Sequence, residues 1–235
     1  ISIPMFMARE EFKSLKELSI PGNFKDPLNL DILLKDDIDG ATKDFLITIG
    51  VKQLNINTYV TTHIPRILNE NDVSINDLRH LVDVLSSALS TFINDEESRE
   101  SLIHCKIVEC EDGLFRKGDE VYFYNEILAD LFGENNYHIV NYPTNKIQES
   151  YIELYRFIGV SQNPRPYDII EFVKNILNEE NIVNKISKIE KIYYYLSENW
   201  EKFDDYEINE YDELKKLAWL PHDNNGIEWH KPCNL

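Results

Sequence analysis

Apolar residues recur along this chain with the spacing of amphipathic helices. The longest run covers residues 75–92 and follows an i, i+3, i+4, i+7 stripe. The stripe consists of Ile75, Leu78, Leu81, Val82, Leu85, Ala88, Leu89 and Phe92. Ser74 and Asp77 are placed to cap its first turn. A second long helix is predicted over residues 184–200. Its buried face is expected to carry Ile186, Ile189, Ile192, Tyr193 and Leu196.

Shorter apolar runs predict further helices before and between these two. They cover residues 42–49, 59–68, 128–132, 149–158 and 167–177. Gly50, Gly133 and Gly159 follow three of them, where a glycine commonly closes a helix. Pro166 precedes another, at a position that tolerates proline.

β-Branched and aromatic residues around turn sequences predict hairpins. Residues 103–109 and 114–123 are expected to pair across the turn that ends at Gly113. Residues 217–221 and 227–235 have the same outline across a turn that ends at Gly226. A third hairpin is expected near the N-terminus, with residues 8–11 in place of a glycine turn.

The pattern repeats along the chain. Residues 45–51 are FLITIGV and residues 155–160 are YRFIGV, with the two Ile-Gly-Val triplets 109 positions apart. A second motif, an aromatic residue followed by basic and polar positions and then an aliphatic residue, occurs at residues 12–18, 115–121 and 229–235. Self-similarity at such a period indicates stacked supersecondary units.

We therefore predict an α+β fold of two tandem repeats of about 110 residues, each with a β-hairpin and several helices. The first repeat spans residues 1–124 and has an extra leading hairpin, and the second spans residues 125–235 and ends in the closing hairpin. The second also carries an acidic link at residues 204–214. The chain opens inside an apolar run and stops at the last residue of a repeated motif, so we expect a piece of a longer protein.

Composition narrows the classes of partner. The chain has 235 residues and a formal charge of −18, which disfavours binding to nucleic acid and to anionic membranes. No apolar run approaches the roughly 20 residues of a spanning helix, and no signal peptide is evident. Three cysteines indicate reduced thiols and a cytoplasmic protein. The abundance of Lys, Asn and Ile fits an AT-rich bacterial genome.

Residues capable of chemistry form no complete motif. Cys105 and Cys110 have zinc-like spacing, but a second ligand pair from His222, His230 and Cys233 is a whole repeat away. His63, His80 and His138 have no neighbouring nucleophile. Acidic pairs are expected on solvated faces, and no phosphate-binding glycine loop is present. We therefore assign no catalytic, cofactor-binding or metal-binding residue.

The aromatic run Tyr193–Tyr195, with Trp200 and Phe203, is the best candidate for binding another protein. Aromatic residues are enriched at interfaces, so the run suits either contact with the neighbouring repeat or a docking patch for a partner. Both alternatives remain open from the sequence.

Two stretches carry a family resemblance. Residues 217–221 with 229–232, and residues 113–123 with 128–133, resemble the internal repeats of sacsin-like proteins and of NO VEIN-type relatives. The resemblance implies a repeat region that follows an N-terminal GHKL-type ATPase and serves chaperone-like quality control. The D-x-G-x-G loop of that ATPase is absent from this chain, so no catalytic residue is carried over.

The expected function is therefore that of a non-catalytic repeat or scaffold module in a large cytoplasmic chaperone-like ATPase. It would transmit conformational change or bind a protein client, with other domains of the parent chain as alternative partners. A stand-alone interaction scaffold is the second hypothesis. A hydrolase with a site assembled from distant residues is the third.

Overall fold

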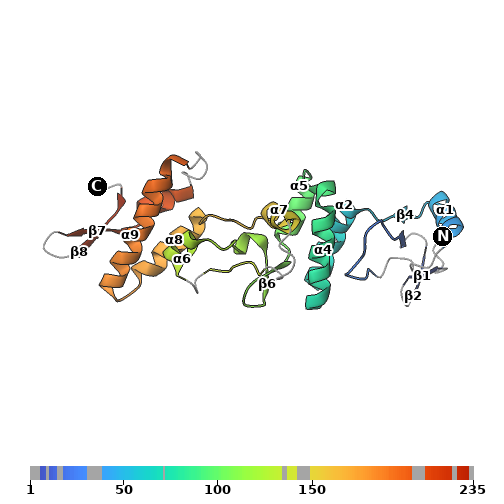
Figure 1. Ribbon diagram of the computed structural model, residues 1–235, viewed down its shortest axis with the longest axis horizontal. Helices are drawn as coiled ribbons and strands as arrows, with labels where there is room; N and C mark the ends of the chain where they lie inside the picture. Colours follow the sequence, from blue (N-terminus) through green and yellow to red (C-terminus); the bar gives the residue numbers. More distant parts are fainter. Residues whose placement is uncertain are drawn as a thin grey trace. The chain divides into compact units, whose positions relative to one another are not determined.

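The computed structural model (Figure 1) confirms a mixed α+β fold in which helices dominate and strands form small pairs. The chain divides into two compact units. The N-terminal unit contains Ile1–Val121 and Val140–Val160, and the C-terminal unit contains Tyr122–Ile139 and Ser161–Leu235. The residues that the structure describes are 6–8, 11–14, 18–30, 39–70, 72–133, 137–141, 149–202, 210–223 and 227–232.

The N-terminal unit combines short strands with a group of helices. Its strands are β1 Phe6–Ala8, β2 Glu11–Lys13, β3 Ser19–Ile20, β4 Lys52–Gln53, β5 Val108–Glu109 and β6 Phe115–Arg116. Its helices are α1 Gly40–Thr48, α2 Ile56–Thr58, the π-helical turn η1 Tyr59–His63, α3 Ile64–Glu70, α4 Ile75–Phe92, α5 Glu96–Ile103, the 3₁₀ turn η2 Gly118–Glu120 and α7 Glu149–Phe157.

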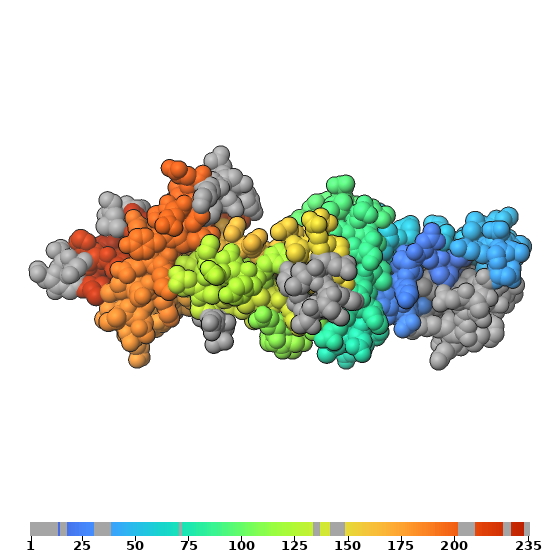
Figure 2. All heavy atoms as spheres, in the orientation of Figure 1, coloured from blue at the N-terminus to red at the C-terminus, as the bar shows by residue number. Residues whose placement is uncertain are grey.

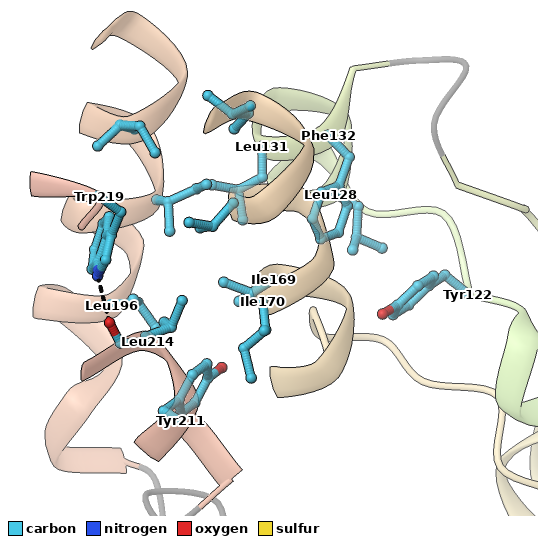
Figure 3. Packing of buried hydrophobic residues seen from close by; sticks show 14 residues of the cluster. Tyr122, Leu128, Leu131, Phe132, Ile169, Ile170, Leu196, Tyr211, Leu214 and Trp219 are labelled. Carbon is cyan, nitrogen blue, oxygen red and sulfur yellow. Dashed lines mark hydrogen bonds between the residues drawn. The ribbon is translucent and has the colours of Figure 1, made fainter. Parts of the chain in front are cut away.

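The C-terminal unit is built around one apolar core. Its elements are α6 Glu126–Phe132, α8 Pro166–Leu177, α9 Ile182–Asn199, the 3₁₀ turns η3 Trp200–Lys202 and η4 Tyr211–Lys216, and the strands β7 Leu220–Asp223 and β8 Ile227–His230. Leu128, Ile169 and Ile192 are fully buried in this core. Figure 3 shows the core from close by, with the indole Nε1 of Trp219 donating to the carbonyl of Leu214 at 3.1 Å. That bond lets a large aromatic side chain be buried without leaving its N–H unpaired.

Three antiparallel hairpins occur where the repeated aromatic motif predicts them. Met7 pairs with Phe12, Glu109 with Phe115, and Pro221 with Trp229. In each hairpin the aromatic residue of the motif lies on the second strand. The turn residues of the first hairpin lie outside the described part of the chain.

Helices α1 and α7 match in length and in the way they end. Each has nine residues, and their first residues are 109 positions apart. Gly50 and Gly159 have φ of 96° and 93°, a left-handed conformation that favours glycine. The amide of Val51 donates to the carbonyl of Leu46 at 2.9 Å, and the corresponding bond after α7 is also 2.9 Å. Both helices therefore close with a Schellman motif.

The strand that follows each motif also pairs in the same manner. Ser19 pairs in parallel with Lys52, directly after α1. Tyr122 pairs in parallel with Ser161, directly after α7. Lys52 and Ser161 differ by the same 109 positions as the two Ile-Gly-Val triplets. These are local correspondences. The boundary after residue 124 and the two-repeat architecture stay predictions.

Several predicted elements differ from the structure. Residues 96–103 form α5, which the sequence pattern does not predict, so the strand expected from residue 103 is shortened to β5. Glu96 and Glu97 in the first turn of α5 suit the positive end of the helix dipole. The prediction that Tyr193 lies on the buried face of α9 is wrong, because its side chain is 51% exposed.

Gly118 offers a test of the close packing in the N-terminal unit. A Cβ at this position would collide with the carbonyl oxygen of Ile158, whereas a Cβ at Gly40 would meet nothing within 4 Å. We expect Gly118→Ala to lower the free energy of unfolding by about 1–3 kcal/mol, the usual cost of overpacking. Gly40→Ala is the control and should change it by less than about 0.5 kcal/mol or stabilise α1. Urea denaturation measures both, and equal stability of the two variants would contradict this packing.

Candidate docking surface

Helix α7 is held in the N-terminal unit through one apolar face. The hydroxyl of Tyr151 donates to the carboxylate of Asp83 on α4. One turn later Leu154 is fully buried, and Ile158 is fully buried after the end of the helix. We call Tyr151, Leu154 and Ile158 the α7 face. Their i, i+3, i+7 spacing places them on one side of the helix.

The partners of this face are α4 and the segments beside it. The ring of Phe157, the last residue of α7, lies 5.7 Å from the ring of Phe92, the last residue of α4. Tyr151 near the start of α7 contacts Asp83 in the middle of α4, so both ends of α7 contact α4. A Cβ on Gly159 would lie 3.0 Å from the side chain of Ile103 in α5. The closing turn of α7 is therefore covered as well.

Helix α1 carries the matching positions at the surface. Thr42, Phe45 and Ile49 correspond to the α7 face at the 109-residue offset, and we call them the α1 face. Phe45 is 57% exposed and Ile49 is 43% exposed. A Cβ on Gly50 would meet nothing within 4 Å, unlike one on Gly159. Phe45 and Ile49 are thus exposed on α1, light blue in Figure 2, at positions whose counterparts on α7 are buried.

Helix α9 resembles α4 in length, cap and buried stripe. Both have 18 residues, and a side chain caps each, since Ser74 accepts from the Asp77 amide and Asn181 from the Asn184 amide. When the two helices are aligned on their first residues, three buried positions coincide. The pairs are Val82 with Ile189, Leu85 with Ile192, and Leu89 with Leu196.

The same alignment relates the α7-contacting side of α4 to an exposed side of α9. Asp83 corresponds to Glu190, and Ser86, one turn along, corresponds to Tyr193. Ser86 is buried whereas Glu190 and Tyr193 are exposed. We call Glu190 and Tyr193 the α9 face. Of the other aromatic candidates from the sequence, Tyr194 is also exposed and Tyr195 packs against the core. The ring of Trp200 lies 6.1 Å from that of Tyr211, and Phe203 lies outside the described residues.

The cysteines that the sequence offered as zinc ligands are buried in the fold. The thiol of Cys105 donates to the carbonyl of Ser101 at 3.2 Å, and burial raises the pKa of this thiol to about 12. Burial also raises the pKa of the Cys110 thiol, against a smaller opposing effect of Arg116. Desolvation disfavours the thiolate that metal binding and nucleophilic attack require.

Other candidate ligands are dispersed. His222 and His230 face each other across the last hairpin with ring centroids 5.5 Å apart. Cys233, their expected companion, lies outside the described residues. Among the residues that the structure describes, no three or more His, Cys, Asp or Glu side chains gather in a way that could hold a metal ion. His63 lies in η1, His80 in α4 and His138 between α6 and the Ile139 bridge.

Buried polar groups form structural pairs. Arg79 makes two hydrogen bonds, at 2.8 and 2.5 Å, to the buried carboxylate of Glu109. In the C-terminal unit the Tyr122 hydroxyl donates to Asp168, and the Arg165 guanidinium lies 4.3 Å from the Tyr122 ring centroid. Burial, and then the bond to Asp168, raise the pKa of Tyr122 well above its ordinary value. A tyrosine held protonated in this way acts as a hydrogen-bond donor that links Asp168 of α8 to the bridge segment at Tyr122.

Sequence comparisons provide no further assignment. No protein-family model, curated protein or solved structure matches the chain. Within the described ranges, every helix is too short or too polar to cross a membrane. The candidate site therefore depends on the geometry of the α1 and α9 faces. The sequence pointed to Tyr193, but it gave no sign that Phe45 and Ile49 are exposed, because their apolar character alone favours a core position.

The burial of the two cysteines predicts slow thiol chemistry. At pH 8 an ordinary thiol is partly ionised, whereas a group with a pKa of about 12 is almost wholly protonated. We expect Cys105 and Cys110 to resist iodoacetamide in the folded protein and to react once urea unfolds it. Peptide mass spectrometry of the alkylated protein measures this. Rapid alkylation of Cys105 in the native state would contradict its buried environment.

Proposed function

We propose that the chain is a non-catalytic α+β repeat module that joins to neighbouring protein through matched helix faces. One observation carries the proposal: the face that buries α7 against α4 recurs, exposed, on α1. Repeat units of this kind contact their neighbours through repeated surfaces, and their function is to extend a scaffold or to present a binding face.

The correspondence of the elements supports the repeat. Helices α1 and α7 share length, spacing and end geometry, and each is followed by a parallel bridge whose later partner, Lys52 or Ser161, lies at the same offset. Helices α4 and α9 share length, N-cap and buried stripe. A hairpin follows each of these longer helices, with the aromatic motif on its second strand. Independent matches in helix, cap and strand favour a common unit over chance similarity of single motifs.

Several of the described groups that could perform chemistry are engaged in the fold. Cys105 and Cys110 are buried, Glu109 is paired with Arg79, and Asp168 accepts from Tyr122. These observations favour a structural role over a hydrolytic one. The strongly acidic composition further favours a protein partner over nucleic acid or an anionic membrane.

The resemblance of residues 217–221 and 229–232 to sacsin-like repeats suggests the wider setting. We propose that the module serves a large cytoplasmic chaperone-like ATPase, where it transmits conformational change or binds a client. A row of units that pack on one another is suited to that task, since a displacement of one unit changes the packing of the next.

Exchange of the matched segments tests the repeat directly. Residues 149–160 are replaced by the sequence of residues 40–51, which keeps the apolar face and the closing glycine in register. We expect cooperative unfolding to persist with a loss of about 2–5 kcal/mol, because Tyr151 becomes Thr and Tyr155 becomes Leu. Circular dichroism during urea unfolding provides the measurement.

The control for this exchange is the same graft shifted by one residue. Replacing residues 149–160 by the sequence of residues 41–52 rotates the apolar face by about 100°. It also moves the glycine from position 159, where the backbone is left-handed, to position 158. We expect this variant to lose cooperative unfolding. If the shifted graft were as stable as the graft in register, the proposed equivalence of α1 and α7 would be wrong.

A further inference from the structure

We propose that the α1 face of one copy of this chain docks on the α9 face of a second copy. The proposal rests on the repeat function above and names the partner of these two surfaces. In this contact α1 takes the place of α7 and α9 takes the place of α4, as in the contact inside the N-terminal unit. The association is head to tail, since the two surfaces that meet are different.

The α7–α4 contact shows what such a face accepts. Helix α7 binds Asp83 of α4 through Tyr151, places Leu154 in the interior, and closes with a glycine turn beside Ile103 of α5. Helix α1 has the same length, the same spacing of apolar positions and the same closing turn. It therefore offers the shape that the α4 type of surface already binds.

The side chains at the two faces also compensate in size. In the N-terminal unit the large Tyr151 of α7 donates to Asp83, and the small, buried Ser86 follows three residues later on α4. In the proposed contact α1 contributes the smaller Thr42, and α9 contributes Tyr193 in place of serine. The large aromatic side chain is thus on the α7-type helix in the internal contact and on the α4-type helix in the proposed one. Phe45 takes the position of Leu154. Similar total volume is the condition under which an apolar contact tolerates substitution.

A second copy is the occupant because one chain carries both complementary surfaces. Each copy presents one α1 face and one α9 face, and a contact between two copies leaves one of each exposed. Such a heterologous contact continues beyond a dimer unless the rotation closes a ring. The charge of −18 on each copy opposes approach, so we expect association to strengthen as salt screens the repulsion.

Two substitutions remove one face each. Phe45→Asp puts a charge on the α1 face, and Tyr193→Asp puts one on the α9 face. The adjacent exposed residues provide matched controls. Ile47 corresponds to Arg156, which is exposed in α7, and Tyr194 corresponds to Ser87, which is exposed in α4. Ile47→Asp and Tyr194→Asp therefore change equally apolar surface positions outside the proposed contact.

Sedimentation velocity of the full 235-residue chain tests the proposal. We expect the wild type to form species larger than a dimer as concentration and salt increase. Phe45→Asp and Tyr193→Asp should each weaken association about tenfold or more, as hot-spot residues do, whereas the two controls associate like the wild type. Circular dichroism confirms that each variant is folded, and Ile49→Asp provides a second variant of the α1 face.

Mixing the two disrupted variants is the decisive step. Phe45→Asp retains an intact α9 face and Tyr193→Asp retains an intact α1 face, so the mixture should form dimers and nothing larger. A mixture that stays monomeric would overturn the proposal, as would equal weakening by the controls or a monomeric wild type at all concentrations and salts. If the graft of residues 40–51 also keeps its cooperative unfolding, the repeat stands and only self-docking is wrong.

Discussion

The burial of the α7 face against α4 is the contact on which the organisation of the N-terminal unit depends. Residues 149–160 lie in the sequence between the two segments of the C-terminal unit, yet α7 packs on α4 in the N-terminal unit. The two compact units therefore alternate along the chain. The return is fixed by Leu154 and Ile158, which are fully buried, and by the Tyr151–Asp83 bond. Apolar burial supplies the free energy, and the hydrogen bond to a carboxylate fixes the register of the helix.

That contact imposes requirements on neighbouring segments. The backbone of Ile158 approaches Gly118 so closely that no side chain fits, and Gly159 brings the chain past Ile103. The amide of Asn141 then donates to the carbonyl of Glu109 at 2.8 Å, which ties the start of the returning segment to β5. Arg79 in turn pairs with the buried Glu109. Helix, hairpin and returning segment therefore stabilise one another, and each supplies groups that the others need.

Local pattern predicted much of this fold. The stripe over residues 75–92 and the glycine caps at Gly50 and Gly159 are properties of adjacent residues, and both occur as predicted. Helix α5 was missed because acidic residues dominate it and only Leu102 and Ser98 are buried. The exposure of Tyr193 could not be predicted, since its position on the helix suits burial and its exposure depends on which segment packs beside α9. The same holds for Phe45, whose counterpart Leu154 has identical spacing but is covered.

Exposed apolar residues on a helix indicate whether a further segment is expected to pack on it. A repeat that needs no further contact presents a polar outer face, because apolar surface left in water costs free energy and invites association. Helix α1 presents Phe45 and Ile49, and α9 presents Tyr193, at the positions where the internal contact is buried. If these faces were polar caps, charged residues would be expected at positions 45 and 193, the counterparts of Leu154 and Ser86. Phe45 and Ile49 instead have the apolar character of the buried α7 face, and α9 has the aromatic Tyr193 where α4 has the buried Ser86.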